Sequence, residues 1–167
     1  MLRVIKDEAA RIAELRSGGL DAVRDLTPAV LPTVKADPNL DVLTRPALNV
    51  AYLGVSDAVR PLDKVEVRRA IAMAIDRSVM TTALYSGAGR SASQLIPPGL
   101  LGYDESVVEF TRHDVAGAKR LLTEAGVGSG FATELWYPTA WRSQHAEPRR
   151  LAESVSADLA RIGITVA

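Results

Sequence analysis

The chain has 167 residues, of which 47% are hydrophobic, 24% charged and 5% aromatic, a balance typical of a folded globular protein with one domain or two small ones. Twenty Lys and Arg residues offset twenty Asp and Glu residues, so no net charge attracts nucleic acid or an anionic membrane. The absence of cysteine excludes disulfides, thiolate-bound zinc and thiol catalysis.

The N-terminal stretch MLRVIKDEAARIAELRSGG carries charges throughout, so we expect no export signal in this chain. Its apolar runs are a few residues long, far short of the ~20 residues that a membrane-spanning helix needs. The composition therefore favours a protein that does not cross the membrane.

The first third of the chain predicts short elements. Asp7 can cap a helix that runs to about Ser17, where Gly18 and Gly19 supply a left-handed stop. A second short helix is predicted to begin near Thr27, with Pro32 inside it and Pro38 at its end. Extended segments are predicted at residues 20–23, 40–44 and 48–55.

The middle of the chain has the strongest helical pattern of the first half. Asp63 is the expected N-cap of a helix whose apolar residues recur at steps of three and four. Asp76 is expected to end this helix and to cap a second one over residues 77–85, closed by Gly87. Residues 91–102 show no periodicity and contain two adjacent prolines, so they predict an ordered loop.

The last third predicts helices that alternate with strands. Asp114 caps a helix that reaches Ala125 and is stopped by Gly126. A strand over 131–137, a helix over 147–162 and a strand over 164–167 follow. Because a terminal strand leaves backbone groups unpaired, we expect the natural domain to continue beyond both ends of this sequence.

No motif in the chain predicts catalysis, a cofactor or a metal. The runs SGAGRS and GVGSG follow helices, whereas a dinucleotide loop lies between a strand and a helix, so Gly87 and Gly126 are interpreted as helix stops. His113 and His145 lie in separate segments without a second ligand at metal-binding spacing. No G-x-S-x-G elbow occurs, so no catalytic residue is predicted.

One segment, LWYPTAWRSQH, concentrates the aromatic residues of a chain that has few. It places Trp136, Tyr137, Trp141 and Arg142 in a strand and the loop that follows. Aromatic walls beside an arginine can hold an organic ligand that bears a carboxylate, by stacking and by paired hydrogen bonds. The equally weighted alternative is that the aromatic residues belong to the core and Arg142 lies on the surface.

Five blocks together resemble one family, the peptide/nickel/oligopeptide solute-binding proteins of ABC importers. In chain order they are RIAELRSGGLDAV, ALNVAYLGV, VEVRRAIAMAIDRSVMTTALYSGAGRSASQLIPPGLLGY, HDVAGAKRLLTEAG and ELWYPTAWRSQHAEPRRLAESVSADLARIGITV. The resemblance covers essentially the whole chain. It implies an α/β chain that is part of a two-lobed periplasmic-binding-protein fold of type II, truncated at both ends.

The resemblance also implies an organisation. Residues 1–46 resemble part of the first lobe, residues 47–167 resemble part of the second, and the hinge falls at Asn49 and Val50. In dipeptide-binding members the arginine after the L-W-Y strand contacts the carboxylate of the ligand, and Arg142 occupies that position. Those members carry a tyrosine two residues later, where this chain has Gln144.

The function implied by this resemblance is capture of a peptide or similar solute between two lobes and delivery to a membrane permease. The location implied is periplasmic or otherwise extracytoplasmic, peripheral to the membrane, with no enzymatic activity and no nucleic-acid partner. Nickel, haem and oligosaccharides stay open as ligands, because fold does not determine ligand. The alternative function is that of a truncated product without transport activity, which acts only as a structural or interaction module.

Overall fold

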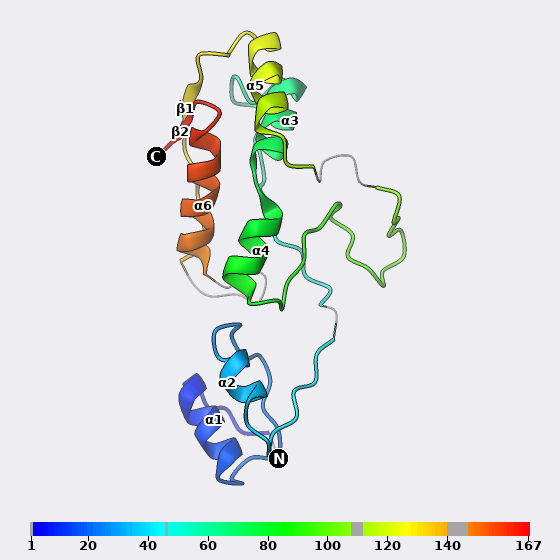
Figure 1. Ribbon diagram of the computed structural model, residues 1–167, viewed down its shortest axis with the longest axis vertical. Helices are drawn as coiled ribbons and strands as arrows, with labels where there is room; N and C mark the ends of the chain where they lie inside the picture. Colours follow the sequence, from blue (N-terminus) through cyan, green and yellow to red (C-terminus); the bar gives the residue numbers. More distant parts are fainter. Residues whose placement is uncertain (1, 46, 108–111, 140–146) are drawn as a thin grey trace. The chain divides into compact units, whose positions relative to one another are not determined.

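The structure is a computed structural model that describes residues 2–45, 47–107, 112–139 and 147–167. Its contacts divide the chain into two compact units, Met1–Arg45 and Pro46–Ala167 (Figure 1). This division falls one residue before the boundary that the resemblance implies. The assignment of the two units to two lobes stays a prediction.

The first unit contains two short helices, α1 (Glu8–Arg16) and α2 (Leu31–Lys35). The predicted cap of α1 is confirmed, because Asp7 Oδ1 accepts a hydrogen bond from the backbone N–H of Ala10 at 2.7 Å. The predicted start of α2 near Thr27 is wrong. Pro32 lies in the first turn of α2, where a missing N–H leaves no helical bond unmade, so the helix begins at Leu31 and tolerates the proline at its N-terminal end.

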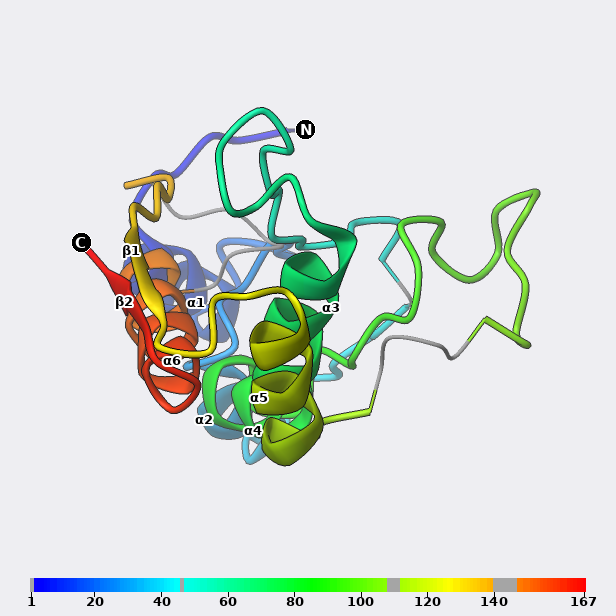
Figure 2. The ribbon, with the colours of Figure 1, turned by 90° about the horizontal axis from the view of Figure 1, so that it is seen from above.

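The second unit is built on four helices: α3 (Val65–Ala74), α4 (Arg77–Tyr85), α5 (Val115–Glu124) and α6 (Pro148–Ala160). The pair α3 and α5 makes the most extensive helix contact, and the two lie side by side in Figures 1 and 2. The buried core joins these helices to the strands through the side chains of Val67, Ala70, Ile71, Ala74, Ala118, Leu122, Val155, Leu159, Ile162 and Ile164.

Two predicted caps in this unit are confirmed, and one is wrong. Asp76 Oδ1 accepts from the N–H of Val79 at 3.1 Å, and Asp114 Oδ1 accepts from the N–H of Gly117 at 2.8 Å. The N-cap of α3 is Lys64 instead of Asp63. Asp63 lies one residue too early to reach the first turn of α3, and its carboxylate pairs with Arg60 at 3.5 Å.

The predicted helix stops at Gly87 and Gly126 are confirmed. Both glycines have positive φ, at 78° and 75°, the left-handed conformation that ends helices at low cost when no Cβ is present. The predicted loop over residues 91–102 is confirmed, and it is part of a longer stretch without helix or strand, residues 86–107.

The strands β1 (Phe131–Thr133) and β2 (Ile164–Val166) pair in parallel, with Phe131 opposite Ile164 and Thr133 opposite Val166. Helix α6 lies between them in the sequence, so β1, α6 and β2 together form a β–α–β unit. The predicted strand over 131–137 is too long. Backbone bonds continue from β1 only as far as Leu135, whose N–H reaches the carbonyl of Ala167 at 3.4 Å.

The extended segments predicted at 20–23, 40–44 and 48–55 do not form strands in the structure. A strand is defined by backbone bonds to a neighbouring strand. Among the described residues only β1 and β2 provide such bonds, and they pair with each other.

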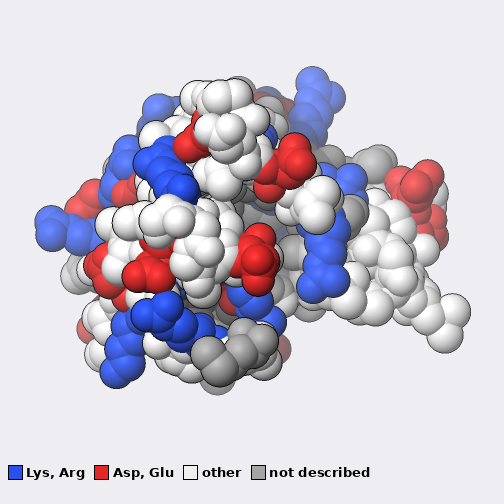
Figure 3. Space-filling model, turned by 90° about the horizontal axis from the view of Figure 1, so that it is seen from below, with Lys and Arg blue, Asp and Glu red and all other residues white. Residues whose placement is uncertain are grey.

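On the face shown in Figure 3, acidic and basic side chains are interspersed. Within the described ranges, no helix combines the length and the apolar character that crossing a bilayer requires.

Candidate functional site

The candidate site lies where the ladder between β1 and β2 ends. In open α/β sheets, ligands bind at the carboxyl ends of parallel strands. Trp136 and Tyr137 follow β1 at this end and are exposed by 87% and 45%. Trp141 and Arg142 lie outside the described residues, so their predicted contact with a ligand stays a prediction.

The residues from Phe131 to Trp136 alternate between two faces. Phe131, Thr133 and Leu135 are half-buried, whereas Ala132, Glu134 and Trp136 are exposed. The two-residue period of extended backbone explains this separation. Trp136 Nε1 donates a hydrogen bond to Glu134 Oε2 at 3.3 Å, which holds the indole on the exposed face.

Tyr137 lines a hollow of about 440 Å³ between the segment after β1 and the start of α6. The volume lies within the range of small-ligand sites. Its lining is mostly apolar and includes two arginines: Tyr137, Pro138, Thr139, Glu147, Pro148, Arg149 and Arg150. Trp136 does not line it, so the structure separates two aromatic residues that the sequence grouped together.

Both arginines of the hollow have acidic partners on the same helix or at its cap. Arg149 Nε pairs with Glu153 Oε1 at 2.8 Å, and Arg150 Nη1 pairs with Glu147 Oε2 at 3.0 Å. The hydrogen bond that Arg149 donates to Glu153 raises the pKa of Arg149, and the negative charge of Glu153 raises it further. Both arginines are therefore exposed residues in ion pairs with carboxylates close by in the sequence. The sequence did not predict that these two arginines line a hollow, because the position of the hollow depends on where β1 ends.

The predicted hinge residues lie just after the division between the two units. Asn49 is exposed and Val50 is half-buried, and neither belongs to a helix or strand. Irregular backbone of this kind can absorb the torsional change of a hinge. The hinge assignment stays a prediction.

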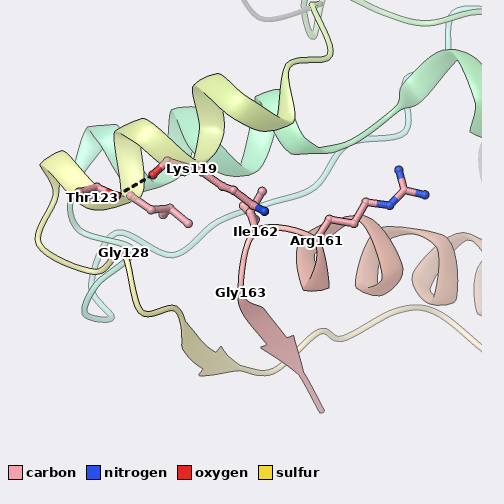
Figure 4. A pocket seen from close by; sticks show the side chains of 7 residues that line it. Lys119, Thr123, Gly128, Arg161, Ile162 and Gly163 are labelled. Atoms are coloured by element: carbon pink, nitrogen blue, oxygen red, sulfur yellow. Dashed lines mark hydrogen bonds between the residues drawn. The ribbon is translucent and has the colours of Figure 1, made fainter.

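A second hollow, of about 370 Å³, lies between α5 and the junction of α6 with β2. Figure 4 shows Lys119 extending across it towards Ile162, whereas the guanidinium of Arg161 points away. Arg161 Nη1 lies 3.4 Å from Asp158 Oδ1 on α6, and the Thr123 hydroxyl donates to the carbonyl of Lys119 at 3.0 Å. One ammonium group faces this second hollow, whereas two arginines line the hollow at Tyr137. The second hollow is therefore the weaker candidate for a ligand site.

The arrangement of acidic residues and histidines does not form a metal centre in the part of the chain that the structure describes. No group of three His, Cys, Asp or Glu side chains converges there. His113 Nδ1 lies 3.4 Å from Asp76 Oδ2, which is a single ion pair when the imidazole is protonated. His145 lies outside the described residues.

Comparison with known proteins gives a match over the whole chain. Residues 1–167 match the family model described as "Bacterial extracellular solute-binding proteins, family 5 Middle". Heme-binding protein A of Haemophilus influenzae is 35% identical over 98% of this chain, and the dipeptide-binding protein of Escherichia coli is 36% identical over 96% of it. The chain spans about 30% of the length of each of these two relatives.

Solved structures match the fold over nearly the same extent. HbpA2 from Haemophilus parasuis superposes with a TM-score of 0.87 at 33% identity, over 99% of this chain and 32% of that one. The dipeptide-binding protein of Pseudoalteromonas sp. SM9913, in complex with Met-Leu, gives 0.80 at 28% identity, over 98% of this chain and 32% of that one.

Proposed function

The chain belongs to family 5 of the bacterial extracellular solute-binding proteins, and from this premise we propose that it is part of the binding component of an ABC importer. Its helices and strands form part of the type II periplasmic-binding-protein fold, corresponding to about a third of each matched structure. The proposed activity is capture of a peptide or a similar small solute between two lobes and its delivery to membrane permease subunits. The match over all 167 residues is the observation that carries this proposal.

We assign residues 1–46 to one lobe, residues 47–167 to the other, and the hinge to Asn49 and Val50. The division of contacts into two units supports this assignment. As a solute-binding protein the chain performs no catalysis, and the family description supports a location outside the cytoplasm.

For the ligand contacts we propose Arg142 as the carboxylate-binding residue, with Trp141, Tyr137 and Trp136 as aromatic neighbours. The hollow beside Tyr137 supports this, because it lies at the carboxyl end of β1 and has apolar walls. Trp136 has the weakest support of the four, since its indole is on the exposed face and outside the hollow.

Isothermal titration with Ala-Ala and Ala-Ala-Ala tests peptide capture. We expect heat of binding from the chain, and a loss of about tenfold or more in affinity in Arg142→Ala, because an arginine-carboxylate pair is a strong charge-assisted contact. Arg24→Ala is the matched control, since Arg24 pairs with Asp25 and does not line the hollow. Unchanged peptide affinity in Arg142→Ala would remove Arg142 from the site. Saturable hemin binding by absorbance, without peptide heat, would favour haem, the ligand named for the Haemophilus influenzae relative.

The second candidate function is that of an interaction module without transport activity. The observation in its favour is a sheet of two strands, each of three residues, because so small a sheet is only marginally stable alone. Size-exclusion chromatography with thermal unfolding tests it. A monomer that melts cooperatively at every concentration contradicts the need for a partner, and a concentration-dependent assembly supports it.

A further inference from the structure

Met73 on α3 is joined to the start of α5 by its backbone and by its side chain. Its carbonyl accepts a hydrogen bond from the N–H of Asp114 at 2.9 Å. Its side chain is half-buried against the core and reaches α5, which lies beside α3 in Figures 1 and 2. A Cβ added to Gly117 would lie 2.6 Å from the Cε methyl of Met73. The methyl group therefore fills the space that the missing side chain of Gly117 leaves open.

The carboxylate that caps α5 lies at the same place. Asp114 Oδ1 accepts a hydrogen bond from the N–H of Gly117, and Asp114 Oδ2 lies 2.5 Å from the position of the same added Cβ. Gly117 is buried, so the thioether methyl and the capping carboxylate meet at a packed contact. An apolar methyl group is compatible with this neighbour, whereas a group with a negative partial charge would be repelled.

The thioether of methionine can be changed chemically into such a group. Hydrogen peroxide transfers one oxygen atom to the sulfur, which gives a sulfoxide and water. A sulfur lone pair forms the new S–O bond and the O–O bond of the peroxide breaks, so the sulfur loses two electrons and the peroxide gains them. The product carries an oxygen with a negative partial charge where the thioether was apolar.

We propose that Met73 is an oxidation site through which peroxide loosens α5 from α3. The sulfoxide oxygen adds volume to a close-packed contact and lies beside the Asp114 carboxylate, which repels it. Met80 offers an internal comparison, because only 8% of its surface is exposed and peroxide reaches it less readily. The third methionine, Met1, lies outside the described residues. This inference involves none of the residues proposed to contact the ligand.

The test treats the folded chain with hydrogen peroxide and locates the sulfoxides by peptide mass spectrometry. We expect oxidation of Met73 to be at least about threefold faster than oxidation of Met80, because the reaction follows exposure. The melting temperature of the oxidised chain should fall by about 3 °C or more, the scale of one lost contact in a domain of this size. Amide hydrogen exchange at residues 115–118 should become at least about fivefold faster, since the first turn of α5 opens more often.

Met73→Leu and Met80→Leu are the matched variants, because leucine nearly keeps the volume and forms no sulfoxide. After peroxide, the Met73→Leu chain should keep its melting temperature, whereas the Met80→Leu chain should lose as much as the unchanged sequence. Methionine sulfoxide reductases of both types should restore the unchanged sequence, since each type reduces one of the two epimers. Oxidation of Met80 as fast as Met73, an unaltered melting temperature in a chain oxidised at Met73, or an equal loss in Met73→Leu overturns the proposal. Melting that stays low after mass spectrometry shows the sulfoxide reduced overturns it as well.

Discussion

Asp158 on α6 accepts a hydrogen bond from the backbone N–H of Asp76 at 3.0 Å, across 82 positions of the sequence. Asp158 is the one buried charged residue in the described core, with 7% of its surface exposed. Its second carboxylate oxygen lies 3.4 Å from Arg161. The contact joins α6 to the junction between α3 and α4, where Asp76 also caps α4.

We predict that Asp158→Ala lowers the free energy of unfolding by about 1–3 kcal/mol, because it leaves the half-buried N–H of Asp76 without an acceptor. Asp158→Asn should cost less, since the amide oxygen still accepts. Urea unfolding followed by circular dichroism measures both. Asp57→Ala, at an exposed carboxylate, is the control and should change stability by less than about 0.5 kcal/mol. Equal stability of the Asp158→Ala and Asp57→Ala chains would show that the bond contributes nothing.

The side chain of Lys64 caps the C-terminal end of α5. Its Nζ donates to the carbonyl of Ala125 at 2.6 Å, one of the carbonyls that a helix end leaves without an intrahelical partner. We expect Lys64→Met to lower stability by about 1 kcal/mol, the typical net value of one such bond. Lys119→Met, at a lysine without an ion pair in the described ranges, controls for the loss of charge. Hydrogen exchange should show the loss at residues 121–127, and a change that is uniform over the unit would contradict a local role.

Gly130 and Gly163 approach each other at the start of the two strands. Gly130 has φ of 84°, and a Cβ at this position would collide with the carbonyl oxygen of Gly163. Gly130→Ala should cost about 2 kcal/mol or more, since it combines a left-handed conformation with a backbone clash. Gly126→Ala isolates the conformational part, because Gly126 has φ of 75° and open space around it. Thermal unfolding of both chains compares them, and an equal effect would mean that β1 can move away from β2.

We predict that the contribution of Asp114 to the free energy of unfolding depends on pH. The backbone hydrogen bond from Gly117 lowers the pKa of Asp114 below its ordinary value of 3.8. A carboxyl group whose folded pKa is depressed stabilises the fold above its unfolded pKa, and this contribution disappears as pH falls through the folded pKa. Asp114→Asn keeps an acceptor at the cap but does not titrate. Urea unfolding between pH 2.5 and pH 7 should therefore show a smaller loss of stability below about pH 4 in this variant. Parallel curves for both chains would contradict the assignment.

The sequence by itself determined several helix ends of this protein, although not the start of α2 or the cap of α3. Asp7, Asp76 and Asp114 cap helices within three residues of themselves, and Gly87 and Gly126 stop helices through their own φ angles. These signals are local, because a helix makes its backbone bonds within four residues. The family was identified by the resemblance of five blocks of residues, and the match over residues 1–167 confirms it.

Only the tertiary structure decided which extended segments became strands, because their backbone bonds go to residues distant in the sequence. Residues 48–55 have a strand pattern and form none, whereas β1 pairs with β2 across the whole of α6. The position at which this pairing ends also separates Tyr137, at the hollow, from Trp136, on the exposed face. Lys64 and Asp158 had no sequence signal for their roles, since their partners Ala125 and Asp76 are brought to them by the packing of helices.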